Sequence, residues 1–196
     1  MTLFKGKYRV ESTRLKGWDY TSPGYYYITI ITRNREMFFG HISNDKIIYS
    51  ETGKIANVYW QEIPVHFPHV EMDKYIVMPN HVHGLLKINT DGGNTNGEMP
   101  SPDKQISQKP AIPYILHRSI NTEKNINPFW KPGNLGVIIN QYKRICTIKS
   151  RKTTPRFGWQ TRFHDHIIRD EDELNRIRQY IILNPLKWND DRNFHS

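Results

Sequence analysis

The sequence contains almost no cysteine and no long apolar run. Cys146 is the single cysteine among 196 residues, which excludes an internal disulfide bond and a zinc site built from cysteines. No apolar stretch approaches the roughly 20 residues that a membrane-spanning helix needs, and the first residues lack the apolar core of a secretory signal. We also find no internal repeat and no glycine-rich loop that could cradle nucleotide phosphates. These absences predict a cytoplasmic protein without a membrane partner.

Positive charge is what the sequence has in excess. Its 28 lysines and arginines outnumber 19 aspartates and glutamates, which gives a formal net charge of +9 and a pI of about 9.6. An excess of this size suits a polyanionic partner such as nucleic acid. Aromatic residues make up 12% of the chain, which is typical either of a core of large side chains or of flat surfaces on which unpaired bases stack. Composition alone does not separate an enzyme from a binding module.

The hydrophobic pattern predicts an α+β domain with an antiparallel sheet and helices packed on one face. Runs rich in β-branched and aromatic residues predict four long strands and a short hairpin, at 25–32, 70–78, 81–88 and 159–168, and at 38–42 with 46–49. Apolar residues at helical spacing predict three helices, at 51–63, 134–149 and 170–184. Asp170 and Glu173 have the spacing of a capping box at the start of the last helix, and Pro185 is expected to end it.

We expect residues 23–188 to form one folded domain. Residues 1–22 are polar and basic and are predicted to be a loosely packed N-terminal extension, and residues 189–196 are predicted to be a C-terminal tail. Within the domain, residues 89–110 are rich in Gly, Asn, Ser and Pro and contain almost nothing to bury. This composition predicts a flexible insertion rather than a folded unit.

Two histidines in the segment MPNHVHGLL, residues 78–86, are the candidates for a metal site. Side chains alternate along a strand, so His81 and His83 are expected to point the same way while Val82 points to the opposite face. Two adjacent imidazoles can chelate one divalent ion. Gly84 strengthens this interpretation, because glycine leaves room for a ligand to approach the backbone. Two protein ligands are too few for a closed structural site, which favours a catalytic ion that polarises a substrate oxygen.

The same segment resembles the HUH motif (His, bulky apolar residue, His) of the single-tyrosine transposases of bacterial insertion sequences, and most of all that of the REP-associated tyrosine transposases. Near the C-terminus, WQ from Trp159, FHDHIIRD from Phe163 and YIILNPLKW from Tyr180 are similar to the closing strand and helix of that family. The match spans about residues 23 to 188, in the family's order. The resemblance implies a ferredoxin-like (RRM-like) fold, single-stranded or hairpin DNA as partner, Mg²⁺ or Mn²⁺ as cofactor, and a monomer or a homodimer.

The resemblance also implies roles for individual residues. Tyr180 matches the nucleophile that attacks a DNA phosphate, which gives a 5′-phosphotyrosine link and a free 3′-hydroxyl. Asn184 matches a third metal ligand one helical turn later, and positions i and i+4 do share a helix face. A free phenol has a pKa near 10, so a nearby cation would favour the phenolate. Lys143 matches a basic position of the family and is expected, with its basic neighbours, to contact DNA phosphates; these neighbours are Arg144, Lys149, Arg151 and Lys152.

Several alternatives remain open at this point. His164 and His166 form a second His-x-His pair, interpreted as neighbouring structure or DNA contacts, with Asp165 near the site. Tyr142 is a rival nucleophile, although the apolar stripe of its helix favours burial. The predicted function is a metal-dependent tyrosine transposase that cleaves and transfers DNA strands. The alternatives are a non-catalytic, domesticated regulator that binds hairpin DNA or RNA on the same fold, and a zinc-dependent hydrolase that uses water.

Overall fold

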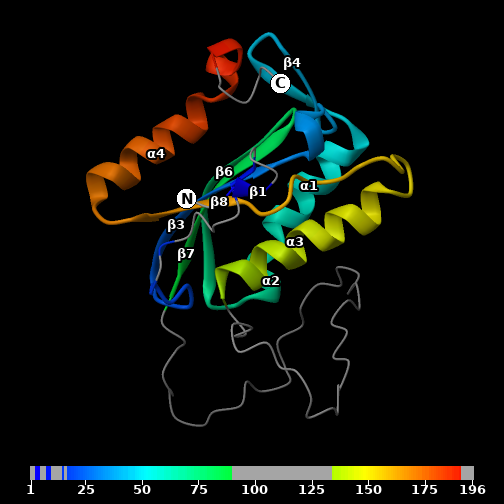
Figure 1. Cartoon of the computed structure of the whole chain (residues 1–196). Helices are drawn as coiled ribbons and strands as arrows, with labels where there is room; N and C mark the ends of the chain where they lie inside the picture. The colour runs from blue at the N-terminus through cyan, green and yellow to red at the C-terminus, as the bar shows by residue number, and fades with distance from the viewer. Residues whose placement is uncertain (1–2, 5–7, 10–14, 16, 90–133, 191–196) are drawn as a thin grey trace, which may run out of the picture.

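The computed structural model describes residues 3–4, 8–9, 15, 17–89 and 134–190 of the chain (Figure 1). The predicted insertion lies outside the described residues except for Asn89, and so do residues 191–196 of the predicted tail. No helix in the described part of the chain is both long enough and apolar enough to cross a membrane.

A four-stranded antiparallel sheet in the order β6-β7-β3-β8 forms the centre of the molecule. Its strands are β3 (Gly24–Ile31), β6 (Val70–Met78), β7 (His81–Ile88) and β8 (His164–Ile168). The central strands β3 and β7 pair along their whole length, from Gly24 opposite Ile88 to Ile31 opposite His81. Two short antiparallel pairs accompany the sheet: β1 (Leu3–Phe4) with β2 (Tyr8–Arg9), and β4 (Gly40–Ser43) with β5 (Lys46–Tyr49).

The helices follow the strands in an order that defines the fold. They are η1 (Arg33–Arg35), α1 (Glu51–Gln61), α2 (Ile63–His66), α3 (Leu135–Ser150), α4 (Glu171–Leu183) and η2 (Pro185–Asp190). The sheet and its two long crossover helices run β3-α1-β6-β7-α3-β8, which is the split βαβ arrangement of ferredoxin-like domains. The predicted α+β class is therefore confirmed.

Helices lie on both faces of the sheet (Figure 1). On one face, Ile28 and Val82 of the central strands pack against Trp60 of α1 and Tyr142 of α3 in the main core. On the other face, α4 packs through a smaller apolar cluster, formed by Leu85, Leu174 and Ile181. The expected packing of helices on one face holds for α1 and α3, and α4 adds a layer on the opposite face.

Two predicted element boundaries need correction. The last strand begins at His164 and not at Trp159, because Arg162 has a left-handed backbone with φ of 66° and Trp159 forms only an isolated bridge with Thr32. Pro64 does not end the helical segment, because proline is tolerated in the first turn of α2.

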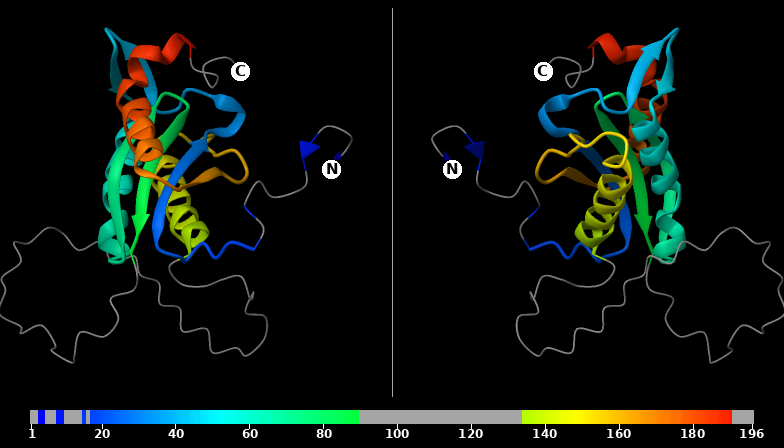
Figure 2. Two further views of the ribbon diagram at one scale, coloured as in Figure 1. Left: turned by 90° about the vertical axis from the view of Figure 1, so that its left-hand side faces the viewer. Right: turned by 90° about the vertical axis from the view of Figure 1, so that its right-hand side faces the viewer.

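The two ends of the predicted domain also differ in detail. Asn184 keeps helical geometry, with φ of −58° and ψ of −41°, although Pro185 follows it. The chain therefore continues directly from α4 into η2. At the other end, Tyr20 is 5% exposed and belongs to the main core, so the packed part of the chain begins ahead of residue 23. Figure 2 shows η2, in red, at the same end of the molecule as the β4–β5 hairpin, in light blue.

Candidate active site

His81 and His83 lie side by side on β7, on the face of the sheet that α4 covers. Their ring centroids are 4.4 Å apart, and both side chains are fully buried. Val82 between them belongs to the core on the opposite face. The expected placement of two neighbouring imidazoles is found.

A buried asparagine sets the orientation of His81. His81 Nδ1 lies 2.8 Å from Asn80 Oδ1. The amide nitrogen of Asn80 donates to the carbonyl oxygen of Arg35 at 3.2 Å, which directs Oδ1 toward the imidazole. Because an amide oxygen only accepts, this contact requires the proton on His81 Nδ1, and a neutral imidazole then carries its lone pair on Nε2. A lone pair on one ring nitrogen, with the other nitrogen held by a hydrogen bond, is the arrangement of metal-binding histidines.

Two hydroxyl groups of β3 hold His83. Its Nδ1 lies 2.8 Å from the hydroxyl oxygen of Tyr27 and 3.0 Å from that of Thr29. The Tyr27 ring also stacks on His83, with ring centroids 5.6 Å apart. The strand register explains these contacts, because Thr29 is directly opposite His83 in the β3–β7 pairing. The second ring nitrogen of His83 faces α4.

Tyr180 of α4 reaches the histidine pair of its own chain. Its hydroxyl oxygen lies 3.4 Å from His83 Nε2, and the two ring centroids are 5.2 Å apart. The helix that carries Tyr180 is anchored by Arg178, which bonds Asp73 of β6 at 2.6 Å. Tyr180 is 40% exposed, so its phenol connects the buried pair with the molecular surface. The Tyr180 side chain is therefore accessible from solvent.

The chain beyond Tyr180 returns to the histidine pair through η2. The Trp188 ring stacks on His81, with centroids 6.0 Å apart and 26° between the ring planes. Asn184 lies between these two contacts in sequence and is 2% exposed. The imidazole nitrogens and the carboxamide oxygen of Asn184 are donors that suit a divalent ion. No group of three or more His, Cys, Asp and Glu side chains within the described residues could hold an ion, so further ligands would come from Asn184 or the substrate.

Gly84 serves packing and not the metal site. A Cβ atom at this position would overlap the indole ring of Trp60, which lies on the opposite face of β7. The prediction that Gly84 leaves room for a ligand is therefore wrong. The residue leaves room for the largest side chain of the core.

The second His-x-His pair lies on the same face of the sheet, at its edge. Thr29 of β3 is opposite His83 on one side and opposite His164 on the other. His164 and His166 are both exposed, and His166 Nε2 lies 2.7 Å from Glu173 Oε1. These two histidines are neighbouring structure, as one of the two interpretations expected, and their contact with DNA stays a prediction.

Three other predicted residues lie away from the histidine pair. Asp165 is opposite Ile28, whose side chain is in the main core, so Asp165 faces away from the site, contrary to the prediction. Tyr142 is 3% exposed and donates its hydroxyl to the Ala56 carbonyl oxygen at 3.1 Å, so burial excludes it as a nucleophile. The third residue, Lys143, bonds backbone carbonyl oxygens of the segment that precedes β8.

The ammonium group of Lys143 joins α3 to the segment before β8. It donates to the carbonyl oxygens of Gln160 and Arg162, both at 2.9 Å. Burial lowers the pKa of Lys143 to about 8. These contacts give the residue a structural role, and its predicted contact with a DNA phosphate is not tested by them.

The other predicted DNA-binding residues also lie on or just after α3. Arg144, Arg151 and Lys152 are exposed, and Lys149 is half-buried. Because α3 packs on the main core, its N-terminal part lies behind the sheet as seen from the histidine pair. The end of α3 differs, since Arg151 Nε donates to the Phe157 carbonyl oxygen at 2.9 Å and so lies beside the following loop.

Exposed basic residues lie on two neighbouring segments, and the first of them contacts the turn that precedes His81. Arg33 N donates to the Gly158 carbonyl oxygen, and Thr32 N donates to that of Asn80, each at 2.9 Å. The Arg33 guanidinium also donates to the Arg156 carbonyl oxygen. We call four exposed residues here the basic patch: Arg33, Arg151, Lys152 and Arg156. The sequence analysis had assigned DNA binding to Arg151 and Lys152 only. Arg33 and Arg156 are 123 residues apart in the chain, and the fold brings them together.

Sequence reasoning also missed the residues that hold the site together. No role was assigned to Asn80, Tyr27, Thr29 or Trp188 from the sequence. Thr29 is opposite His83 only through the β3–β7 register, so the sequence alone carried no signal for this contact. The stacking of Trp188 on His81 had no signal either, because it depends on the path of η2 after Pro185.

Comparison with known proteins agrees with this fold. No family model matches the chain. Among solved structures, the chain is similar to a REP-associated tyrosine transposase bound to a REP hairpin, with a TM-score of 0.53 and 15% identity over 92% of this chain and 74% of that chain. The protein therefore has a transposase-like fold. A Haemophilus influenzae protein described as uncharacterized is 32% identical over 188 residues, which are 95% of this chain and 94% of that protein. The chain belongs to the same protein family as this Haemophilus influenzae protein.

Proposed function

We propose that the chain is a metal-dependent single-tyrosine transposase that nicks and rejoins single-stranded or hairpin DNA. One observation carries the proposal: the Tyr180 hydroxyl lies 3.4 Å from His83 Nε2, beside the neighbouring ring of His81, within one chain. The likeness in fold to a REP-associated tyrosine transposase bound to a REP hairpin supports the same activity and a hairpin DNA partner.

His81 and His83 would hold a divalent ion through their Nε2 atoms, and Asn184 would add a carboxamide oxygen. When bound, such an ion favours the phenolate form of Tyr180 and neutralises charge on the phosphate oxygens. Asn80 supports this role because it fixes His81 in the tautomer that leaves Nε2 unprotonated. Imidazoles also suit zinc and nickel, so the proposal of Mg²⁺ or Mn²⁺ follows the family resemblance.

The proposed covalent step uses the phenol as nucleophile. The Tyr180 hydroxyl loses its proton, and its oxygen forms a bond to the phosphorus atom of the scissile phosphate. The bond from phosphorus to the 3′ oxygen breaks, and that oxygen takes up a proton to become a free 3′-hydroxyl. The 5′-phosphotyrosine conserves the phosphodiester energy, so a 3′-hydroxyl can reverse the step and rejoin DNA without a nucleotide cofactor.

The basic patch would hold the DNA strand beside the site. Arg33 follows Thr32, whose backbone bonds the turn that precedes His81, and exposed arginines and lysines are the groups that bind DNA phosphates. Because Tyr180 approaches the histidines of its own chain, we propose that one monomer contains a complete site. We also propose that the protein acts in the cytoplasm. Light scattering across protein concentrations tests the monomer against the homodimer.

The test is the formation of a covalent protein–DNA adduct. The full chain is incubated with a pool of random single-stranded and hairpin DNA in Mn²⁺, and the adduct is measured on a denaturing gel. Wild type is expected to form the adduct, and Tyr180→Phe is expected to form none while hairpin binding stays nearly unchanged. Tyr142→Phe is the matched control, because its buried hydroxyl contributes only about 1 kcal/mol to stability.

The possible results separate the candidate functions. Binding of hairpins by wild type without any adduct would favour the non-catalytic DNA- or RNA-binding regulator. Cleaved DNA without an adduct would favour a hydrolase that activates water with zinc. An adduct that persists in Tyr180→Phe would contradict the assignment of the nucleophile.

A further inference from the structure

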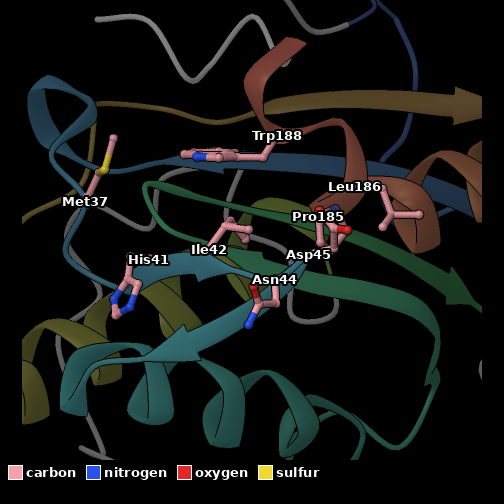
Figure 3. Close-up of a pocket in the computed structure, with 8 residues that line it drawn as sticks. All are labelled: Met37, His41, Ile42, Asn44, Asp45, Pro185, Leu186 and Trp188. Carbon is pink, nitrogen blue, oxygen red and sulfur yellow. The ribbon is translucent and has the colours of Figure 1, made fainter.

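A cavity of about 390 Å³ lies beside the histidine pair, between the β4–β5 hairpin and η2 (Figure 3). Its volume falls within the range of roughly 300 to 1,000 Å³ that is common for sites of small organic groups. Trp188 forms part of its wall and also stacks on His81, so the cavity and the candidate active site share one side chain. A ligand in this cavity would therefore lie one side chain away from His81.

A second wall is attached to the turn before His81. Met37 lines the cavity and belongs to the segment between β3 and β4. Hydrogen bonds join this segment to the turn: Phe39 N donates to the Pro79 carbonyl oxygen at 2.9 Å, and Asn80 donates to the Arg35 carbonyl oxygen at 3.2 Å. The cavity is thus fixed relative to the histidines from two sides.

The lining combines apolar surface with three polar side chains, those of His41, Asn44 and Asp45. Ile42, Pro185 and Leu186 contribute apolar surface together with Met37 and Trp188, and Leu186 is 58% exposed. Figure 3 shows Trp188 on one side of the opening and Asn44 on the opposite side. The eight described residues that line the cavity include neither lysine nor arginine. Asp45 places a carboxylate in the lining, which disfavours a phosphate group, so a flat apolar group with a polar edge fits better.

The polar edge of the cavity is a rigid turn. Asn44 and Asp45 have left-handed backbones, with φ of 50° and 59°, at the tip of the β4–β5 hairpin. This is the geometry of a type I′ turn, which matches the twist of the two strands and sets the backbone of both residues. The carboxylate of Asp45 only accepts hydrogen bonds. Among the bases, cytosine presents an amino group to such an acceptor, whereas thymine does not.

We propose that this cavity binds an unpaired nucleobase next to the scissile phosphate, and that Asp45 selects an amino-bearing base such as cytosine over thymine. The inference rests on the proposed function, since it places the base beside the strand that Tyr180 would attack. Bases have apolar faces and hydrogen-bonding edges, and a base must leave its stack to enter a walled cavity. The site therefore reads one unpaired base.

The test measures binding without chemistry. The full chain is titrated with fluorescent oligo(dC) and oligo(dT) of about 15 nucleotides, close to the length that single-strand binding sites cover. Both strands carry equal charge, so contacts with phosphates cancel. Wild type is expected to prefer oligo(dC) about tenfold, the size of one base-reading contact. Asp45→Gly is expected to reduce the preference to less than about twofold, because it removes the carboxylate and leaves an Asn-Gly turn that favours the same hairpin.

Two further variants isolate the cause. Asp172→Asn removes the same charge at an exposed position of α4, about 20 Å along the helix from Pro185, and is expected to keep the preference. Tyr180→Phe is also expected to keep it, because the cavity does not include the phenol. Equal binding of both strands by wild type, an unchanged preference in Asp45→Gly, or its loss in Asp172→Asn would overturn the proposal. Absence of a covalent adduct in wild type would instead contradict the proposed transposase and leave this binding result to stand by itself.

Discussion

Two His-x-His pairs lie on one face of the same sheet, with the same spacing, and differ in their surroundings. His81 and His83 are on the central strand β7 and are fully buried, whereas His164 and His166 are on the edge strand β8 and are exposed. In the first pair, His81 Nδ1 donates to Asn80 Oδ1, and His83 Nδ1 lies 2.8 Å from the hydroxyl oxygen of Tyr27. In the second pair, His166 bonds a carboxylate of α4.

Sequence spacing therefore places two imidazoles on one face of a sheet, but spacing alone does not make a metal site. A site also needs neighbours that fix the tautomer and a nucleophile that can approach. For the first pair, Asn80 fixes His81, and α4 carries Tyr180 to within 3.4 Å of His83. The apolar cluster between α4 and the sheet is small, and Tyr180 of this helix stays partly exposed. The larger cluster on the opposite face contains most of the buried apolar side chains.

The difference between the two pairs can be tested by removing one histidine from each. His83→Ala should lower the rate of adduct formation by more than about 100-fold, because loss of a ligand costs more than the 10- to 100-fold typical of its supporting residues. His164→Ala should change the rate by less than about threefold, since its side chain is exposed at the sheet edge. Equal losses in the two variants, measured as initial rates in Mn²⁺, would remove the distinction between the pairs.

A second test concerns the support of His81. Asn80→Ala should weaken Mn²⁺ binding by about 10- to 100-fold, because the imidazole loses the hydrogen bond that fixes its tautomer. Calorimetry with Mn²⁺ alone measures this effect independently of cleavage. Asn140→Ala on the exposed side of α3 is the control and should bind Mn²⁺ like wild type. Unchanged affinity in Asn80→Ala would show that the hydrogen bond is incidental.

The packing behind the first pair can be tested separately. Gly84→Ala should lower the free energy of unfolding by about 2 kcal/mol, because its methyl group would overlap Trp60 in a closely packed core. Gly158→Ala should be nearly neutral, since the nearest atoms around its Cβ are 3.7 Å away. Urea unfolding of both variants measures the difference. Full stability of Gly84→Ala would contradict the packing account.

The smallest expected effect concerns the basic patch. Arg156→Ala should weaken binding of single-stranded DNA and reduce the slope of log K against log salt by about 0.7, the contribution of one phosphate contact. Lys54→Ala is the control, because Lys54 is exposed on α1 and paired with Glu51 at 2.7 Å. An identical salt slope in wild type and Arg156→Ala would exclude Arg156 from the DNA path.

The sequence predicted the elements better than the contacts between them. Strand alternation placed His81 and His83 together, and the cap at Asp170 was found at 2.7 Å from Glu173 N as its spacing predicted. Gly84 was misinterpreted, because a glycine that makes space for a ligand and one that makes space for Trp60 have the same sequence signal. The approach of Tyr180 was expected only from the family resemblance, since helical periodicity does not say which face of a sheet a helix covers.

A single sequence carries no signal for the cavity at the tip of the β4–β5 hairpin. Asn44 and Asp45 predict a tight turn, but their position opposite Trp188 depends on the continuation of α4 into η2. Residues before proline are usually extended, whereas Asn184 stays helical. The geometry of the site is therefore set by long-range packing.

The most direct measurement is to identify the residue that carries DNA after the reaction in Mn²⁺. Wild-type protein is digested with protease and nuclease, and the peptides are sequenced by mass spectrometry. The account predicts a single nucleotide-modified peptide, with the 5′-phosphate on the phenol oxygen of Tyr180. A nucleotide on any other side chain, or cleaved DNA with no modified peptide, would contradict it.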